Sequence, residues 1–146
     1  MAKFMKMLNN ISRSQAMFRQ SRVSATDLQP GHYAFALVIC RLPGQSQEEI
    51  ARELYINKST VTRNLNYLEE KGYITRAPLP NDKRRFSVHP TEKMLAVIPE
   101  IKAASAEWRE LLSEGISEED LAVFSSVLER MQEKAGQIIL SQEMIK

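Results

Sequence analysis

Two short helices with strong capping signals, separated by a tight turn, most constrain how this chain can fold. Ser46 precedes Glu49 by three residues, the spacing at which each side chain caps the other residue's backbone amide at the start of a helix. This pattern predicts a helix over residues 47–54. Asn57 is a favourable N-cap for a second helix over residues 58–71, which a glycine ends. The sequence therefore predicts a helix-turn-helix.

Two short runs of alternating apolar and polar side chains follow this pair of helices. They cover residues 73–77 and 85–89, and proline, asparagine and aspartate lie between them. Such runs around turn-forming residues predict a β-hairpin. We expect its loop to be longer than a tight two-residue turn, because the segment between the runs is long and basic. A hairpin after a helix-turn-helix predicts a winged helix-turn-helix in a mainly α fold.

Helical periodicity predicts four further helices around this unit. They cover residues 3–24, 30–41, 92–113 and the segment that starts at Ser117. The second of them is apolar nearly all round and should be buried. Pro99 should bend the helix over 92–113, because proline removes a backbone hydrogen bond and clashes with the preceding turn.

The terminal helices carry long apolar stripes. The residues concerned are Phe4, Leu8, Ile11 and Phe18 near the start, and Leu121, Phe124, Leu128, Met131, Ala135 and Ile138 near the end. Their spacing of three and four residues is close to the seam of a coiled coil. We expect a dimer interface, because one small domain has too little core to bury both stripes. Packing of both stripes within one monomer is the alternative.

Charge is unevenly distributed along the chain. Residues 57–85 hold seven lysines and arginines against three acids, whereas residues 94–146 hold five basic and ten acidic residues. A basic middle beside an acidic end indicates a polyanion that binds at one surface only. A chance cluster on a solvated face is the alternative.

The outward face of the helix over 58–71 carries side chains suited to reading DNA. Val61, Leu65 and Leu68 lie at i, i+4 and i+7 and must face the core. The opposite face has short hydroxyls and amides, which approach bases closely, together with two cations. These residues are Lys58, Ser59, Thr60, Thr62, Arg63 and Asn66. The second helix of a helix-turn-helix lies in the major groove, so we expect these six to contact double-stranded DNA.

The hairpin supplies further cations for the same partner. They are Arg76, Lys83, Arg84 and Arg85. An arginine on a protruding hairpin can enter a minor groove and respond to its width and negative potential. We expect Arg84 to do so, with Asp82 as the wing anchor that holds its guanidinium. The alternative role of Asp82 is to begin the turn.

Several segments, in one order and spacing, resemble the MarR family of bacterial and archaeal regulators. Ser46-Gln47-Glu48-Glu49-Ile50-Ala51 resembles the family's helix before the turn, and Lys58-Ser59-Thr60-Val61-Thr62-Arg63 with the exit at 68–74 resembles its recognition helix. Asp82-Lys83-Arg84 is similar to the wing's Asp-x-Arg, and Val88-His89-Pro90-Thr91 to the family's Val-x-Leu-Thr. Pro90 and Met94 depart from the usual leucine and glycine, so the resemblance does not define the packing where the wing joins the next helix.

The resemblance implies an obligate homodimer that binds a pseudo-palindromic operator. The helices of residues 1–29 and 92–146 would dimerise, and residues 30–91 would form the winged helix-turn-helix that binds DNA, all in one structural domain. We expect a repressor. Many relatives bind a small, often aromatic, effector between these regions. His32, Tyr33 and Trp108 are candidates to line such a site, although core packing is the more common role of each side chain.

Other classes of function find little support in the sequence. No catalytic motif or glycine-rich phosphate loop is present, so an enzyme or a cofactor-binding protein is not expected. His32 and His89 are isolated, which argues against a metal site. Cys40 lies in an apolar helix, where an inert buried thiol is expected rather than a redox sensor. With no signal peptide pattern and no apolar run near ~20 residues, we expect a cytoplasmic protein without a membrane partner.

A winged helix that binds proteins rather than DNA is the rival hypothesis. It would carry an apolar or acidic outward face on the helix over 58–71 and a neutral hairpin. Here that face is polar and carries two cations, and the hairpin is basic. The sequence therefore predicts a sequence-specific DNA-binding transcriptional regulator.

Overall fold

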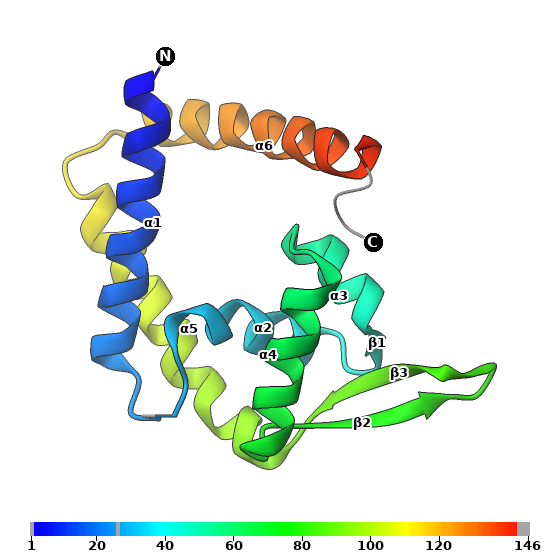
Figure 1. Ribbon diagram of the computed structural model, residues 1–146. Coiled ribbons are helices and arrows are strands. Elements are labelled where there is room, and N and C mark those ends of the chain that lie inside the picture. The colour runs from blue at the N-terminus through cyan, green and yellow to red at the C-terminus, as the bar shows by residue number, and fades with distance from the viewer. Residues whose placement is uncertain (1, 26, 143–146) are drawn as a thin grey trace.

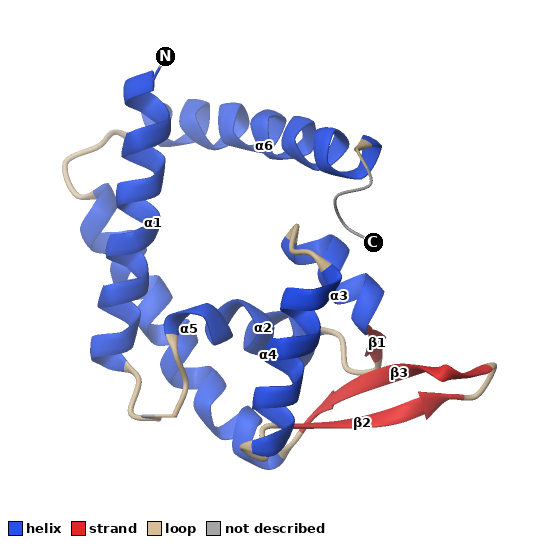
Figure 2. Cartoon of the chain, in the orientation of Figure 1, coloured by secondary structure: helices blue, strands red, loops and turns tan. Residues whose placement is uncertain are grey.

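Most of the chain is helical, and one small sheet projects from the helices (Figures 1 and 2). The computed structural model describes residues 2–25 and 27–142. The elements are α1 (Ala2–Arg22), α2 (Pro30–Arg41), β1 (Gln45–Ser46), α3 (Gln47–Leu54), α4 (Lys58–Glu70), β2 (Ile74–Leu79), β3 (Asp82–Pro90), α5 (Glu92–Ser113) and α6 (Glu118–Ser141). All six predicted helices are confirmed, with ends within two residues of the expected positions.

Local capping explains why the helices begin where the sequence indicates. The Ser46 hydroxyl accepts from the Glu49 amide at 3.2 Å, and the Glu49 carboxylate accepts from the Ser46 amide at 2.7 Å. Asn57 Oδ1 accepts from the Thr60 amide at 2.8 Å at the start of α4. Gly72, with a φ of +80°, takes the left-handed conformation just beyond the end of α4. These bonds satisfy amides that a helix end leaves unpaired.

The hydrophobic core lies beneath α4. Val61, Leu65 and Leu68 are completely buried, as their spacing predicts. Phe35 and Ile39 of the apolar helix α2 share this core, together with residues of α3, β3 and α5. One face of α4 therefore packs on the core, and the opposite face points outward.

The wing is a three-stranded antiparallel sheet with strand order β1-β3-β2. Gln45 and Ser46 pair with Val88 and Ser87, which adds the short strand β1 that the sequence did not predict. The predicted hairpin is confirmed, but the expectation of a long loop is wrong. Leu79 pairs with Asp82, so only residues 80–81 form the turn.

An irregularity in the wing accommodates the extra basic residues. The register shifts between Pro78 and Leu79, since Pro78 pairs with Phe86 and Leu79 pairs with Asp82. Proline has no N–H to donate to the ladder, which favours such a break. Residues 83–85 therefore lie within β3 itself, and the hairpin extends well beyond the helices (Figure 1).

The terminal helices form a second part of the molecule. α1 lies along α5, where the Phe18 ring is 5.3 Å from the Trp108 ring and Arg22 forms an ion pair of 3.1 Å with Glu107. α6 crosses the top of the molecule in Figure 1 and reaches toward α3. Gly136, which contacts the Tyr55 ring, is the one buried residue of α6 in the described chain.

The apolar stripe of α6 is left uncovered within one chain. Its members Phe124, Met131 and Ile138 are exposed, as are the neighbouring apolar residues Val123, Val127 and Leu140. The alternative that one monomer buries both terminal stripes is therefore wrong. In the described residues, no helix has the length and apolar character needed to cross a membrane.

Candidate nucleic-acid interface

The outward face of α4 and the wing form one polar surface. Lys58, Ser59, Arg63 and Asn66 are exposed, and Thr60 and Thr62 are partly exposed. Lys83, Arg84 and Arg85 are exposed on β3. A hollow of about 240 Å³ joins the two elements, lined by Gln47, Glu48, Lys58, Thr62, Arg76, Arg84, Arg85 and Phe86. The structure thus brings predicted residues from α4 and the wing to one place.

Several hydroxyls of α4 are hydrogen-bonded within the helix. Ser59 Oγ donates to Asn57 Oδ1 at 2.9 Å, and Thr62 Oγ1 donates to the Lys58 carbonyl at 3.0 Å. Arg63 Nη2 donates to Thr60 Oγ1 at 3.3 Å. Each of these hydroxyl groups therefore has a defined orientation before any ligand arrives.

Arg76 differs from the other wing cations because its guanidinium is largely enclosed. Nε donates to Glu69 at 2.7 Å, Nη1 to Gln47 at 3.2 Å and Nη2 to Asn66 at 2.8 Å. Only 18% of its side chain is exposed, against 47% for Arg85. Arg76 therefore connects β2 to both helices of the helix-turn-helix.

Glu48 is a residue of the surface that the sequence analysis missed. Its carboxylate lies 3.7 Å from Lys58 Nζ and 3.7 Å from Arg85 Nε. Gln47, beside it, contacts both Arg76 and Thr62. Both residues lie in the first turn of α3. In a helix-turn-helix, the start of the first helix faces the start of the second helix, and this position was the signal available in the sequence.

Asp82 contacts the backbone of Arg84 rather than its guanidinium. The Asp82 carboxylate accepts from the Arg84 amide at 3.0 Å, and no ion pair joins the two side chains in the described chain. The prediction that Asp82 holds the Arg84 guanidinium is therefore wrong, because the partner of Asp82 is the Arg84 backbone amide. An aspartate side chain is short and reaches an amide two residues on, which is its common role in turns.

Comparison with known proteins agrees with this geometry. The model of the MarR family matches residues 26–85. A Thauera aromatica protein, assigned as the transcriptional regulatory protein for the hcr operon, is 30% identical over 119 residues, which is 80% of this chain and 72% of that protein. This chain belongs to the MarR family. It is accordingly a transcriptional regulator rather than an enzyme.

Solved MarR-family structures share the whole fold. A crystal structure of MarR is 30% identical, with a TM-score of 0.78 over 91% of this chain and 90% of that one. The structure of Streptococcus pneumoniae FabT in complex with DNA is 25% identical, with a TM-score of 0.77 over 94% of this chain and 95% of that one. The similarity thus extends through the terminal helices as well as the wing.

The residues considered for effector binding lie in packed surroundings of this MarR-family chain. His32 is buried, accepts from the Gln29 amide at 2.9 Å and stacks on Tyr67 with ring centroids 4.6 Å apart. Burial lowers the pKa of His32. Tyr33 is buried in the core and the half-buried Trp108 packs against Phe18, so each of the three already contacts other side chains of the protein.

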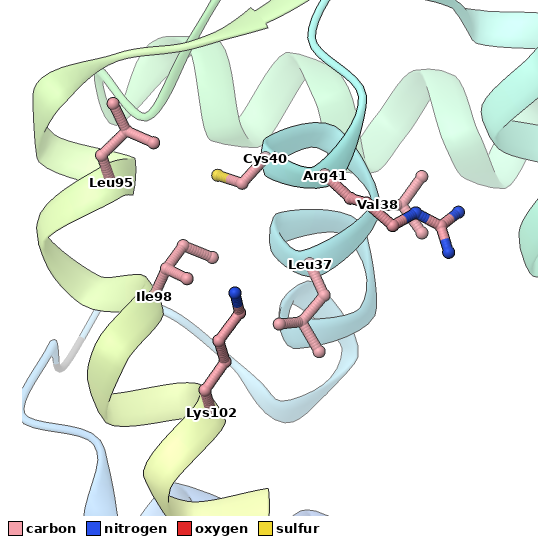
Figure 3. Close-up of a pocket in the computed structure, with 7 residues that line it drawn as sticks. All are labelled: Leu37, Val38, Cys40, Arg41, Leu95, Ile98 and Lys102. Atoms are coloured by element: carbon pink, nitrogen blue, oxygen red, sulfur yellow. The ribbon is translucent and has the colours of Figure 1, made fainter.

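A second hollow lies between α2 and α5 (Figure 3). Its volume is about 390 Å³, and its lining residues are Leu37, Val38, Cys40, Arg41, Leu95, Ile98 and Lys102. Cys40 is half-buried at its edge rather than fully buried as expected. Burial raises the pKa of the Cys40 thiol, which lowers the fraction of reactive thiolate. No cluster of three metal-binding side chains occurs among residues 2–25 and 27–142.

Proposed function

We propose that this protein is a repressor that binds a pseudo-palindromic operator in double-stranded DNA as a homodimer. The observation that carries the proposal is the outward face of α4, which is polar and cationic and is continuous with the basic wing, while the opposite face is completely buried. This arrangement suits a helix that lies in the major groove and a hairpin that follows the adjacent backbone. The complex of FabT with DNA, in which a chain of the same fold binds DNA, supports this assignment.

The two elements are proposed to read different features of DNA. Lys58, Ser59, Thr60, Thr62, Arg63 and Asn66 of α4 would lie along base edges and phosphates of the major groove. Lys83, Arg84 and Arg85 of β3 would bind the backbone and the minor groove, which barely distinguishes A·T from T·A. The wing would therefore supply affinity, and α4 would supply most of the specificity.

The exposed apolar stripes support the homodimer. Residues 1–29 and 92–146 would form the interface and would hold the two copies of residues 30–91 at one spacing. Repression is the mode that we propose, because a dimer on both half-sites excludes other proteins from the operator. A reporter gene behind that operator should then rise in expression when this protein is removed.

An effector site near Tyr33 is supported by an unsatisfied N–H group of Arg19. Arg19 Nε is buried without a hydrogen-bond partner among the described residues, and burial lowers the pKa of its guanidinium. Arg19 is half-buried, and leaving its buried N–H group without an acceptor is costly, so a small aromatic carboxylate that accepts from it would be bound favourably there. Benzoate should weaken operator binding by the wild type but not by Arg19→Met. Lys102→Met, in the hollow of Figure 3, is the matched control and should respond like the wild type.

The salt dependence of binding tests the proposed function directly. If ~6–10 phosphates are contacted, affinity should fall ~10³–10⁵-fold between 50 and 200 mM salt, because bound counterions are released. Isotherms on a selected operator and on a random duplex at several salt concentrations measure this. Absence of any binding to duplex at low salt would instead favour the winged helix that binds proteins.

A further inference from the structure

We infer that Arg76 is a positioning residue that fixes the Asn66 amide as a hydrogen-bond donor toward DNA, so that Asn66 selects a base with a keto group. This inference rests on the proposed function and adds a rule of specificity to it. It concerns one base position of each half-site. It also gives Arg76 a role different from the direct DNA contact that its charge alone suggests.

The orientation of the Asn66 amide follows from the chemistry of its partner. Arg76 Nη2 lies 2.8 Å from Asn66 Oδ1. A guanidinium has five N–H donors and no acceptor, so the amide must present its oxygen to it. The oxygen of Asn66 is thereby directed toward β2, which carries Arg76. The Asn66 side chain is exposed, and its Nδ2 group is left to meet DNA as a donor.

Arg76 is held in this pose by two further bonds. Nε donates to the Glu69 carboxylate at 2.7 Å, and Nη1 donates to Gln47 Oε1 at 3.2 Å. Each of the three guanidinium nitrogens thus donates one N–H within the protein, and only 18% of the side chain is exposed, so a phosphate has little access to the two N–H groups that remain. Arg85, with its single ion pair of 3.7 Å and a more exposed side chain, has no such constraint.

Gln47, which accepts a hydrogen bond from Arg76, also contacts a second side chain of α4. Gln47 Nε2 donates to Thr62 Oγ1 at 3.4 Å, while that hydroxyl donates to the Lys58 carbonyl at 3.0 Å. The hydroxyl hydrogen of Thr62 is therefore already used. Thr62 can therefore offer DNA only an acceptor lone pair and its methyl group, and a threonine methyl suits the methyl group of thymine.

The donor role of Asn66 predicts which bases are accepted. In the major groove guanine presents two acceptors, N7 and a keto oxygen, and thymine presents a keto oxygen, whereas cytosine presents an amino donor and adenine an amino donor beside its N7 acceptor. An asparagine that is free to turn contacts adenine with both its oxygen and its nitrogen. With its oxygen directed toward Arg76, Asn66 can offer DNA only its amide N–H groups and should prefer guanine or thymine over adenine, whose amino group would then have no acceptor.

Selection of duplexes from a random pool, followed by binding isotherms at several salt concentrations, tests this inference. We expect Arg76→Met to lose the keto preference at one position and to gain adenine there, with a change of roughly two- to tenfold for one hydrogen bond. Asn66→Ala should affect the same position, and the double variant should match Asn66→Ala. The slope of log affinity against log salt should stay unchanged in Arg76→Met, whereas Arg85→Ala should reduce it by ~0.9.

Three results would overturn the inference. One is a salt slope that falls in Arg76→Met as in Arg85→Ala, which would make Arg76 a phosphate contact. Another is selection of adenine at the Asn66 position by the wild type. The third is a uniform loss of affinity together with a lower Tm and unchanged base preference, which would make Arg76 merely structural. A wild type that binds no duplex would refute the proposed function itself.

Discussion

Glu48 places a negative charge between two cations that we propose bind DNA. Its carboxylate oxygens lie 3.7 Å from Lys58 Nζ and 3.7 Å from Arg85 Nε. A phosphate that binds either cation must compete with this carboxylate. We therefore expect Glu48 to weaken binding to any DNA and to make the contribution of the bases relatively more important.

Replacing Glu48 with glutamine should strengthen binding to all duplexes. Exposed ion pairs are worth ~0.2–1 kcal/mol each and Glu48 forms two, so the gain should be roughly two- to thirtyfold on operator and random DNA alike. Isotherms at one salt concentration measure it, with Glu70→Gln at the far end of α4 as the control. Equal or weaker affinity for random DNA would show that Glu48 does not compete with phosphate.

Replacing Arg63 and replacing Arg84 should change DNA affinity in different ways. Arg63→Ala should cost ~1–3 kcal/mol mainly on the operator and relax the preference at one base, because Arg63 lies on the outward face of α4. Arg84→Ala should weaken operator and scrambled DNA by similar factors, because it lies on the wing. Binding isotherms on both duplexes measure this. If Arg84→Ala removed the preference among operators and left scrambled DNA unaffected, the wing would be the main reader.

Among the elements, the loop between α1 and α2 is tied to the base of the wing and to α5. The Asp27 carboxylate accepts from the Tyr73 hydroxyl and from Lys93 Nζ at 3.2 Å. Lys93 also donates to the Lys71 carbonyl at 2.7 Å, at the end of α4. One carboxylate thus connects the start of the DNA-binding region to the exit of its recognition helix.

This link should make stability depend on acid pH. The Tyr73 hydroxyl, and then the Lys93 ammonium, hold the pKa of Asp27 below its ordinary value of 3.8. A carboxylate with a lowered folded pKa stabilises the native state above its unfolded pKa, and this contribution is lost as pH falls through the folded value. The Tm of Asp27→Asn should therefore fall less than that of the wild type between about pH 5 and about pH 3. Parallel curves for the two proteins would contradict this.

For the whole molecule, the uncovered stripe of α6 is the feature that a second copy would bury. Met131 is 38% exposed in the single chain and lies among other exposed apolar side chains of α6. Met131→Asp should dissociate or unfold the protein, because it buries an unpaired charge in the proposed interface. Sedimentation measures the result, with Gln132→Asp on the same helix as the control. A folded monomer of the unaltered chain would refute the homodimer.

Features set by local chemistry were predicted from the sequence. The bounds of the helices follow from caps such as Ser46 and Asn57 and from Gly72, which act within one turn of the chain. The buried face of α4 follows from helical periodicity, which Val61 and Leu65 obey. The outward residues of α4 were consequently predicted as well, since they are the remaining face of the same helix.

Features that depend on residues far apart in the chain were decided only by the tertiary structure. The two-residue turn of the wing depends on a register shift at Pro78, and β1 exists only because β3 pairs with it. Arg76 was predicted from its charge as a DNA contact, yet its guanidinium bonds to Gln47, 29 residues earlier in the chain, and to Asn66. The sequence determined which groups can donate and accept, because that is the chemistry of each side chain. Which partners they meet depends on how α3, α4 and β2 pack, and pairing across such separations leaves no periodic pattern in the chain.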